Sequence, residues 1–500
     1  MRETPRSACS SGQTERRGPS PYRACSTDRA GRATRGSPRC PRGRGGSALR
    51  RGAWLRGPSS SSGRGRGRAR RQSYSPGQPE SKTCRLDSVD EPSDDHRDDP
   101  PDDPSHLLGA SVDASFEAAQ VPFLRRLVQQ PSCSREPEDV AAAAWLLDAE
   151  AEALGLSREL HEPTEGPYAD HRVYSTEAAS TADAKGDDRA LLLVGHVDTV
   201  FPRSEGFLEF SRDGDVIRGP GVLDMKSGLS SVLFALRALG AVDPAARRAL
   251  RVRFLVTTDE EVGSPSSRSL IQREANRASA ALVFEAGRDE DLIVTHRKGT
   301  AFFRVTVTGH AVHAGLHHRE GKNAIHALAL LVPRLEAITD YDRGVTVNVG
   351  LIRGGTSKNT VPGHATAELD LRFERSVDGD EAIAQIEEAL RFTLPPSLEG
   401  CTLCLEGGVS RPPMEPSDHT NALRRRYERH AGEAGLGVGE APLQGGGSDA
   451  NILSAAGVAV IDGLGPYGKR FHTPEEWSSL DSLRRRTQAL AGFLYEVAKG

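Results

Sequence analysis

The chain has 500 residues, of which 27% are charged, and its formal net charge at pH 7 is −4. This length allows two or three domains, and because no stretch of about 18 apolar residues occurs, no membrane span is expected. The seven cysteines, an odd number, argue against a disulfide framework and suit a reducing compartment, so we expect a cytoplasmic protein.

An arginine-rich segment and then an acidic segment make up the first hundred or so residues. Arginine, glycine, serine and proline dominate up to Tyr74, and the block DEPSDDHRDDPPDDP follows. Low hydrophobicity and blocks of like charge predict that residues 1–109 form a disordered tail. The arginines could pair with the acidic block or bind nucleic acid non-specifically, and no other nucleic-acid binding is expected.

Helix and strand signals alternate over residues 110–299. Apolar residues at helical spacing occur in SFEAAQVPFLRRLVQQ, VAAAAWLLDAEAEAL and MKSGLSSVLFALRALG, and short apolar runs occur in LLLVG, LVTT and AALVFE. This alternation predicts an α/β catalytic domain, in which helices cover both faces of a mixed sheet with parallel strands.

The pattern changes over residues 300–410. Strand, helix, strand, strand, helix and strand signals follow one another there, in AFFRVTVTG, NAIHALALLVPRLEAI, VTVNVGLIRG, ATAELDLRFE, EAIAQIEEALRF and CTLCLE. The order βαββαβ predicts an inserted ferredoxin-like domain. Residues 411–500 return to α/β character and are expected to complete the catalytic domain.

Polar side chains follow three of the apolar runs. His196 closes the first run and Asp198 lies two residues on, Glu260 and Glu261 follow the second, and Glu285 ends the third. Residues two apart on a strand point to the same side, and open α/β sheets bind ligands at the carboxyl ends of their strands. We therefore expect these side chains to share one site.

Two further candidates lie outside these runs. Asp224 follows the flexible stretch GPGVL and precedes a predicted helix, and His472 lies in FHTPEEW near the end of the chain. The residues after His472, Thr473-Pro474-Glu475-Glu476, are typical of a capping box with proline at the first helical position. The cap would hold the backbone of the histidine rigidly.

The candidates form a ligand set for two metal ions. Imidazole and carboxylate ligands without thiolate suit a catalytic zinc site, with cobalt and manganese as substitutes. His196, Asp224 and Glu285 would hold one zinc, and Asp224, Glu261 and His472 the other. The two zinc ions of each subunit would lie roughly 3.5 to 4 Å apart with Asp224 between them.

Two carboxylates remain outside this ligand set. Glu260 is placed to accept a proton from the attacking water and to return it to the leaving amine. Asp198 is placed to accept the other ring N–H of His196 and to fix its orientation. Each motif alone is common in loops and turns, but together they supply a complete set at strand ends and favour a metal hydrolase.

The motifs together resemble the zinc-dependent aminoacylase and glutamate carboxypeptidase family, which includes acetylornithine deacetylase and succinyl-diaminopimelate desuccinylase. The resemblance spans Leu191 to His472 and rests on GHVDTV, GPGVLDMKSG, TTDEEVGS, FEAG, VTGHAVHAG, GGTSKNTVP, ELDLRF, GGGSDAN and FHTPEEW. Glutamate carboxypeptidase is the most similar member, because Glu285 stands where some relatives carry aspartate. The resemblance also implies a cis peptide after Asp224 and Glu260 as the general base.

The resemblance assigns further roles outside the ligand set. Arg372 and Asn359 are implied to bind the free carboxylate of the substrate, for which a planar guanidinium is well suited. His313 is implied to reach across a homodimer interface, formed by the inserted domain, to the oxyanion in the partner's site. Gly447 in QGGGSDAN is implied to contact substrate, although its glycines could also form only a turn before a capped helix.

The expected reaction is hydrolysis of an amide bond next to a free carboxylate. A glutamate carboxypeptidase is favoured, but Asp291 stands where similar members carry lysine, so deacylation of N-acyl amino acids or cleavage of di- and tripeptides is the alternative. A scaffold or polyanion-binding protein with a silent hydrolase fold is disfavoured, because the ligands and Glu260 are all present.

Overall fold

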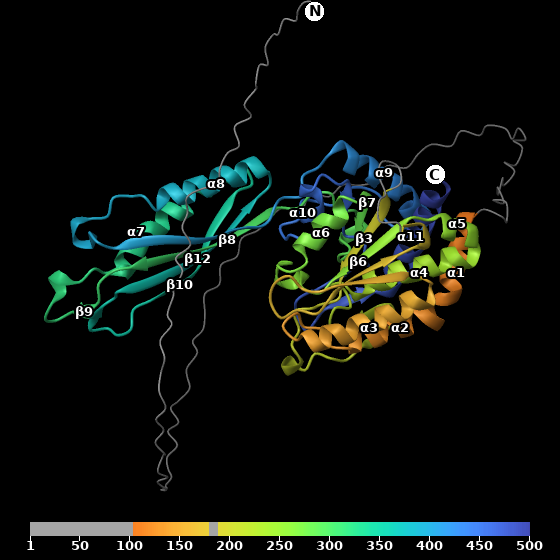
Figure 1. Cartoon of the computed structure of the whole chain (residues 1–500), viewed down its shortest axis with the longest axis horizontal. Helices are drawn as coiled ribbons and strands as arrows, with labels where there is room; N and C mark the ends of the chain where they lie inside the picture. Colours follow the sequence, from red (N-terminus) through yellow and green to blue (C-terminus); the bar gives the residue numbers. More distant parts are fainter. Residues whose placement is uncertain (1–103, 180–188) are drawn as a thin grey trace, which may run out of the picture. The chain divides into compact units, whose positions relative to one another are not determined.

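A six-stranded mixed sheet, the main sheet, organises the larger part of the fold. The structure is a computed structural model that describes residues 104–179 and 189–500 (Figure 1). The strands, in spatial order, are β1 (Ser157–His161), β2 (His171–Ser175), β6 (Val252–Thr257), β3 (Ala190–His196), β7 (Ala278–Val283) and β14 (Val460–Ile461). The last four are parallel to one another, and β1 and β2 extend the sheet with antiparallel pairing. The predicted mixed sheet with parallel strands is confirmed.

Helices cover both faces of the main sheet (Figure 1). Alternate residues of β3 face opposite cores, since Leu191 and Leu193 pack in one apolar cluster while Leu192 and Val194 pack in another. The first cluster includes residues of α1 (Pro104–Ser115), α2 (Val121–Gln129), α3 (Pro137–Ala153), α4 (Lys226–Val242), α5 (Pro244–Ala249), α9 (Asp418–Glu433) and α11 (Leu480–Lys499). The second includes residues of α6 (Arg268–Ala275) and α10 (Asp449–Ala455). Burial on both faces explains why the parallel strands are continuous apolar runs.

Helix α1 begins earlier than expected, at Pro104 rather than near Ala110. Its residues Leu108 and Val112 are buried in the first cluster, and Asp113 pairs with Arg484 of α11 at 2.9 Å. Packing against α11, which is remote in the sequence, accounts for a start that local periodicity did not indicate. The predicted disorder of the remaining tail, residues 1–103, concerns a segment outside the described residues.

A second, antiparallel sheet has the strand order β10-β12-β8-β13. Its elements in chain order are β8 (Gly299–Thr308), α7 (Ala324–Glu336), β10 (Thr346–Gly354), β12 (His364–Phe373), α8 (Ser376–Ala389) and β13 (Thr402–Arg411). Helices α7 and α8 lie on one face of it (Figure 1). This is the predicted ferredoxin-like arrangement, and the burial in β12 alternates with period two.

A small third sheet, in the order β15-β16-β5-β4, was not foreseen. It joins β4 (Ser211–Asp213) and β5 (Val216–Arg218) to β15 (Gly468–Lys469) and β16 (Trp477–Ser479). The pairing of β5 with β16 brings the segment before Asp224 beside the segment that follows His472. Among the helices of the described residues, none is long and apolar enough to cross a membrane.

Candidate active site

The predicted metal ligands meet at the carboxyl edge of the main sheet. His196 is the last residue of β3, Glu285 follows β7, and the turn Glu260–Val262 follows β6. Asp224 comes from the loop before α4, and His472 from the loop between β15 and β16. Parallel strands end at the same edge of a sheet, which is why side chains so distant in sequence converge here.

The carboxylate of Asp224 lies between the two histidines. Its Oδ1 is 3.3 Å from His196 Nε2, and its Oδ2 is 3.4 Å from His472 Nε2. Glu285 Oε1 lies 3.8 Å from His196 Nε2, and Glu261 Oε2 lies 3.0 Å from His472 Nε2. These pairs have the same grouping as the two ligand sets expected from the sequence, with Asp224 common to both.

Groups of ligand atoms that lie within 4.8 Å of one another give a second view of the site. One group is His196, Asp224 and Glu261, and the other is His196, Glu260 and Glu285. This grouping includes Glu260 among the possible donors. We still set Glu260 apart, because its Oε1 forms a 2.7 Å ion pair with Arg411, whereas Asp224, Glu261 and Glu285 form ion pairs with the two histidines.

The electrostatics of the site favour a bound cation. Burial raises the pKa of Glu260 to about 8 and also raises the pKa of Glu261 and of Glu285. Hydrogen bonds to Asp224 and Glu261 raise the pKa of His472 to about 10. After burial, the negative charge of Asp224 is the next cause that raises the pKa of Glu261 and of Glu285, so the carboxylates of the cluster repel one another. Divalent metal ions would supply compensating positive charge, and the nitrogen and oxygen donors fit them.

Asp198 connects the ends of β3 and β6. His196 Nδ1 lies 3.0 Å from the backbone oxygen of Asp198 and 3.5 Å from its carboxylate. The carboxylate accepts hydrogen bonds from Ser134 Oγ at 2.6 Å and from the backbone amides of Glu260 and Glu261 at 3.3 and 3.2 Å. Asp198 is thus placed to orient the imidazole, and it also fixes the turn that carries both glutamates.

The loop that carries Asp224 is held from the opposite side by a residue that the sequence did not single out for this role. The buried carboxylate of Glu476 accepts hydrogen bonds from the amides of Leu223, Asp224 and Gly221, at 2.7, 3.1 and 3.3 Å. The peptide between Asp224 and Met225 is cis, so this expectation is confirmed.

The predicted capping box after His472 is wrong. Residues 473–475 form a bend and a turn, and strand β16 begins at Trp477, so no helix starts there. The carboxylate of Glu476 binds the amides of the Asp224 loop instead of capping a helix in its own segment. Pairing of β16 with β5 extends the chain where the local sequence favoured a helix.

Arg411, at the end of β13, is a further residue that the sequence did not reveal. It is buried, and its guanidinium donates hydrogen bonds to Glu260 Oε1 at 2.7 Å, to Ser264 Oγ at 3.0 Å and to Asp449 Oδ1 at 2.9 Å. A Cβ atom at Gly447 would lie 2.7 Å from Arg411 Cδ, so glycine is required for this packing. The segment SRPPM matches no motif, and only the tertiary contact identifies this arginine.

His313 and Asn359 lie together in a two-stranded ribbon of the inserted region. Strand β9 (Val312–His313) pairs with β11 (Thr360–Val361), and the backbone oxygen of Asn359 accepts a hydrogen bond from the amide of Ala314 at 2.9 Å. Both side chains are exposed. Neither has a contact with the candidate ligands within this chain, and their roles stay predictions.

Arg372 projects from β12 on the polar face of the second sheet. Its guanidinium makes two hydrogen bonds with Asp370, at 2.6 and 2.7 Å, and lies 5.7 Å from the centre of the Phe302 ring. Its Nη1 is 3.4 Å from the backbone oxygen of Gly445, which belongs to the QGGGSDAN segment. That segment leads into α10, which has a capping box formed by Ser448 and Asn451, as in the alternative interpretation of a turn before a capped helix.

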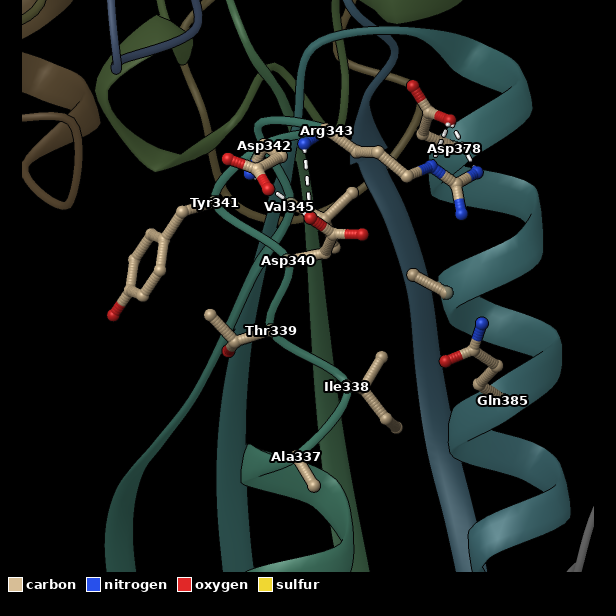
Figure 2. Close-up of a pocket in the computed structure, with 11 residues that line it drawn as sticks. Ala337, Ile338, Thr339, Asp340, Tyr341, Asp342, Arg343, Val345, Asp378 and Gln385 are labelled. Carbon is tan, nitrogen blue, oxygen red and sulfur yellow. Dashed lines mark hydrogen bonds and ion pairs between the residues drawn. The ribbon is translucent and has the colours of Figure 1, made fainter.

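A cavity of about 400 Å³ lies elsewhere in the inserted region (Figure 2). It is formed by the turn after α7 and by α8, and Figure 2 shows Arg343 paired with Asp378 across it. The lining residues do not include any of the predicted site residues. Its one arginine, Arg343, is paired with Asp378 at 2.6 Å, so we do not assign the chemistry to this cavity.

Comparisons with known proteins match most of the described chain. A family model described as "Peptidase dimerisation domain" matches residues 295–397, and one described as "Peptidase family M28" matches residues 178–329. Carboxypeptidase G2 of Pseudomonas sp. (strain RS-16) is 30% identical over 400 residues, which are 79% of this chain and 92% of that protein. Succinyl-diaminopimelate desuccinylase of Leptothrix cholodnii is 28% identical over 368 residues, 69% of this chain and 91% of that protein.

Solved structures support the fold. The aminopeptidase PepT of Bacillus cereus has a TM-score of 0.62 at 22% identity and covers 76% of this chain and 99% of its own. The M20 family metallo-carboxypeptidase Sso-CP2 of Sulfolobus solfataricus has a TM-score of 0.60 at 18% identity, and covers 76% of this chain and 100% of its own.

The contacts of Glu476 generate a testable expectation. Replacing Glu476 with glutamine substitutes an N–H donor for one of the two oxygens that accept hydrogen bonds from the Asp224 loop, and so loosens the carboxylate that faces both histidines. We expect metal affinity to fall roughly 10- to 100-fold, as for other residues that orient metal ligands. Zinc affinity measured by competition with a chelator tests this. The matched control is Glu475→Gln, whose side chain is exposed, and equal affinities for both variants would contradict the role of Glu476.

Proposed function

Because the chain belongs to the M20 peptidase family and is therefore a metallopeptidase, we propose that it cleaves an amide bond next to a free carboxylate. Within this class we favour an activity like that of glutamate carboxypeptidases. The observation that carries the proposal is the carboxylate of Asp224, which lies 3.3 Å from one imidazole and 3.4 Å from another at the carboxyl edge of the sheet.

We propose two zinc ions per subunit. His196, Asp224 and Glu285 would hold one ion, and Asp224, Glu261 and His472 the other. Zinc bound there would polarise the scissile carbonyl and stabilise developing negative charge. Three buried glutamates lie close together here, and burial raises the pKa of each because it disfavours their negative charge. Two divalent cations would compensate this charge.

Glu260 is proposed as the general base and acid. Its carboxylate would accept a proton from the attacking water and return it to the leaving nitrogen. The hydrogen bond from Arg411 to Oε1, at 2.7 Å, supports a fixed orientation of this side chain, and the hydrogen bond from the backbone amide of Glu260 to Asp198 holds its main chain. A fixed orientation matters because proton transfer requires close and aligned heavy atoms.

Arg372 and Asn359 are proposed to bind the free carboxylate of the substrate. The guanidinium of Arg372 is partly exposed and already holds Asp370 in a bidentate pair, which fixes its plane. An anion could approach its remaining edge near Gly445. Substrate contact by Gly447, whose lack of a side chain admits Arg411 beside Glu260, is also part of the proposal.

Deacylation of N-acyl amino acids, or cleavage of di- and tripeptides, is the second candidate. Its support is the similarity to succinyl-diaminopimelate desuccinylase and the fold shared with the aminopeptidase PepT. A hydrolysis screen with zinc decides between the candidates, using C-terminal glutamyl dipeptides, other dipeptides, tripeptides, and N-acetyl and N-succinyl amino acids. No hydrolysis of any of these substrates would contradict the proposed function.

A homodimer through the inserted region is proposed as the working assembly. Strand β10 is an edge of the second sheet and carries the exposed apolar residues Leu351 and Ile352, and Gly354 of the same strand lies against Ile325 of α7, which is also exposed. Exposed apolar residues on an edge strand are typical of a surface that pairs with another chain. The match of residues 295–397 to a peptidase dimerisation domain supports assembly through this region.

Glu260→Gln should retain metal and lose turnover, because the change removes the proposed base and leaves the proposed ligands in place. His472→Ala should lose metal as well as turnover, because it removes a ligand nitrogen. Zinc content and rate are measured together on the same preparations. Turnover by the Glu260→Gln variant near the wild-type rate would overturn the assignment of Glu260.

Mixed dimers test whether His313 serves the partner's site. Co-expressed His313→Ala and Glu260→Gln chains should form heterodimers in which one of the two sites has both residues intact. Random pairing makes about half of all dimers heterodimers, so roughly a quarter of wild-type activity is expected. Each variant alone supplies the baseline. Confirmed heterodimers without recovered activity would show that His313 does not act across the interface.

A further inference from the structure

Arg288 is a half-buried arginine beside the candidate metal centre, and its buried Nε has no hydrogen-bond partner. It lies three residues after Glu285, in the loop between β7 and the turn Asp289–Asp291. Its Nε is buried and has no hydrogen-bond partner, and its guanidinium forms no ion pair with any described carboxylate. The residue is half-buried, so part of the guanidinium reaches solvent.

The surroundings of Arg288 place its charge close to the reaction centre. Burial and the neighbouring Arg297 lower the pKa of Arg288, while Asp462, Glu285 and Asp224 act in the opposite direction. Two of these carboxylates are proposed metal ligands. The buried Nε of Arg288 lacks a partner and the residue is only half-buried, so an anion from outside the protein can reach its guanidinium and supply the missing hydrogen-bond acceptor.

The neighbouring Arg297 differs from Arg288 because its guanidinium has partners within the protein. Its Nε donates to Asp462 Oδ2 at 2.7 Å and its Nη1 to the backbone oxygen of Gly446 at 3.1 Å. These contacts hold Arg297 in the protein. Arg288 has no such contacts, although its backbone is fixed, because Gly287 donates a 2.9 Å hydrogen bond to Pro466 and packs too tightly to accept a side chain.

The acidic residues of the same loop do not neutralise Arg288. Asp291 accepts a hydrogen bond from Ser482 Oγ at 2.7 Å and lies 3.5 Å from Arg486, and Asp289 pairs with Lys469 at 3.2 Å. Both carboxylates are thus held by other groups. Asp291 stands where similar family members carry lysine, and its carboxylate contacts residues of α11. Arg288 supplies a positive charge from the same loop.

We propose that Arg288 determines specificity by binding a second carboxylate of the substrate, in addition to the one assigned to Arg372 and Asn359. The inference rests on the proposed function and extends it to dicarboxylate substrates. A guanidinium binds a carboxylate through two parallel hydrogen bonds, which gives both affinity and direction. The second carboxylate can come from the side chain of a C-terminal acidic residue or from a dicarboxylic acyl group.

Two matched substrate pairs test the proposal and distinguish these sources. One pair is N-acetyl-glutamate and N-acetyl-glutamine, and the other is N-succinyl-alanine and N-butanoyl-alanine. We expect the wild type to prefer the charged member of one pair. Arg288→Met should lower kcat/KM for that member about 10- to 100-fold, as expected for loss of a charged hydrogen bond, and leave the neutral member within about twofold.

Matched variants exclude a general effect of lost charge. Arg288→Lys should retain part of the preference, and Arg248→Met, which removes an exposed arginine of α5, should retain all of it. Equal losses on both members of a pair, or no loss on either, would overturn the proposal. The same holds if the wild type shows no preference for charge.

A binding measurement separates failure of this inference from failure of the proposed function. The unfolding midpoint of the wild type is compared in glutamate and glutamine, and in succinate and butyrate, at equal concentrations. The inference is supported if glutamate raises the midpoint more than glutamine does, or succinate more than butyrate, and if this difference disappears in Arg288→Met. This holds even if no substrate is cleaved. Equal midpoints within both pairs for the wild type would overturn it, whether or not the variant folds.

Discussion

The arrangement of the site depends on one carboxylate. Asp224 presents Oδ1 to His196 and Oδ2 to His472, at 3.3 and 3.4 Å, and so joins the two proposed ligand sets. The two histidines come from distant parts of the chain, and both are oriented toward this residue. The contact with the buried His196 is stronger than it would be in water, and because both sets share Asp224, small displacements of its loop would change both sets together.

The fold fixes this loop from two directions. On one side, His196 is the last residue of a fully buried strand, and Asp198 ties it to the turn that carries Glu260 and Glu261. On the other side, Glu476 accepts hydrogen bonds from three backbone amides of the Asp224 loop, and it belongs to the same segment as His472. The small third sheet makes this second connection, since it pairs the chain before the loop with the chain after His472.

Much of the fold and the ligand set could be predicted because the signals are local. Apolar runs, period-two strands and helical spacing gave the mixed sheet and the βαββαβ region, and each proposed ligand follows a strand or precedes a helix. The third sheet escaped prediction because strands of two or three residues carry no periodicity. The capping box was misread because Glu476 binds a remote loop, and Arg411 was missed because its contacts with Glu260 and Asp449 exist only in the folded chain.

Three buried or half-buried arginines lie near the site, and they differ in whether the protein itself supplies a carboxylate partner for the guanidinium. Arg411 is held by Glu260 and Asp449, and Arg297 by Asp462, so the charge of each is compensated within the protein. Arg288 has comparable surroundings but no partner at its buried Nε. Arg288 also forms no ion pair with a described carboxylate, so its charge is available to an anion from outside the protein. The sequence shows all three only as arginines, and their different functions follow from which carboxylates the fold places beside them.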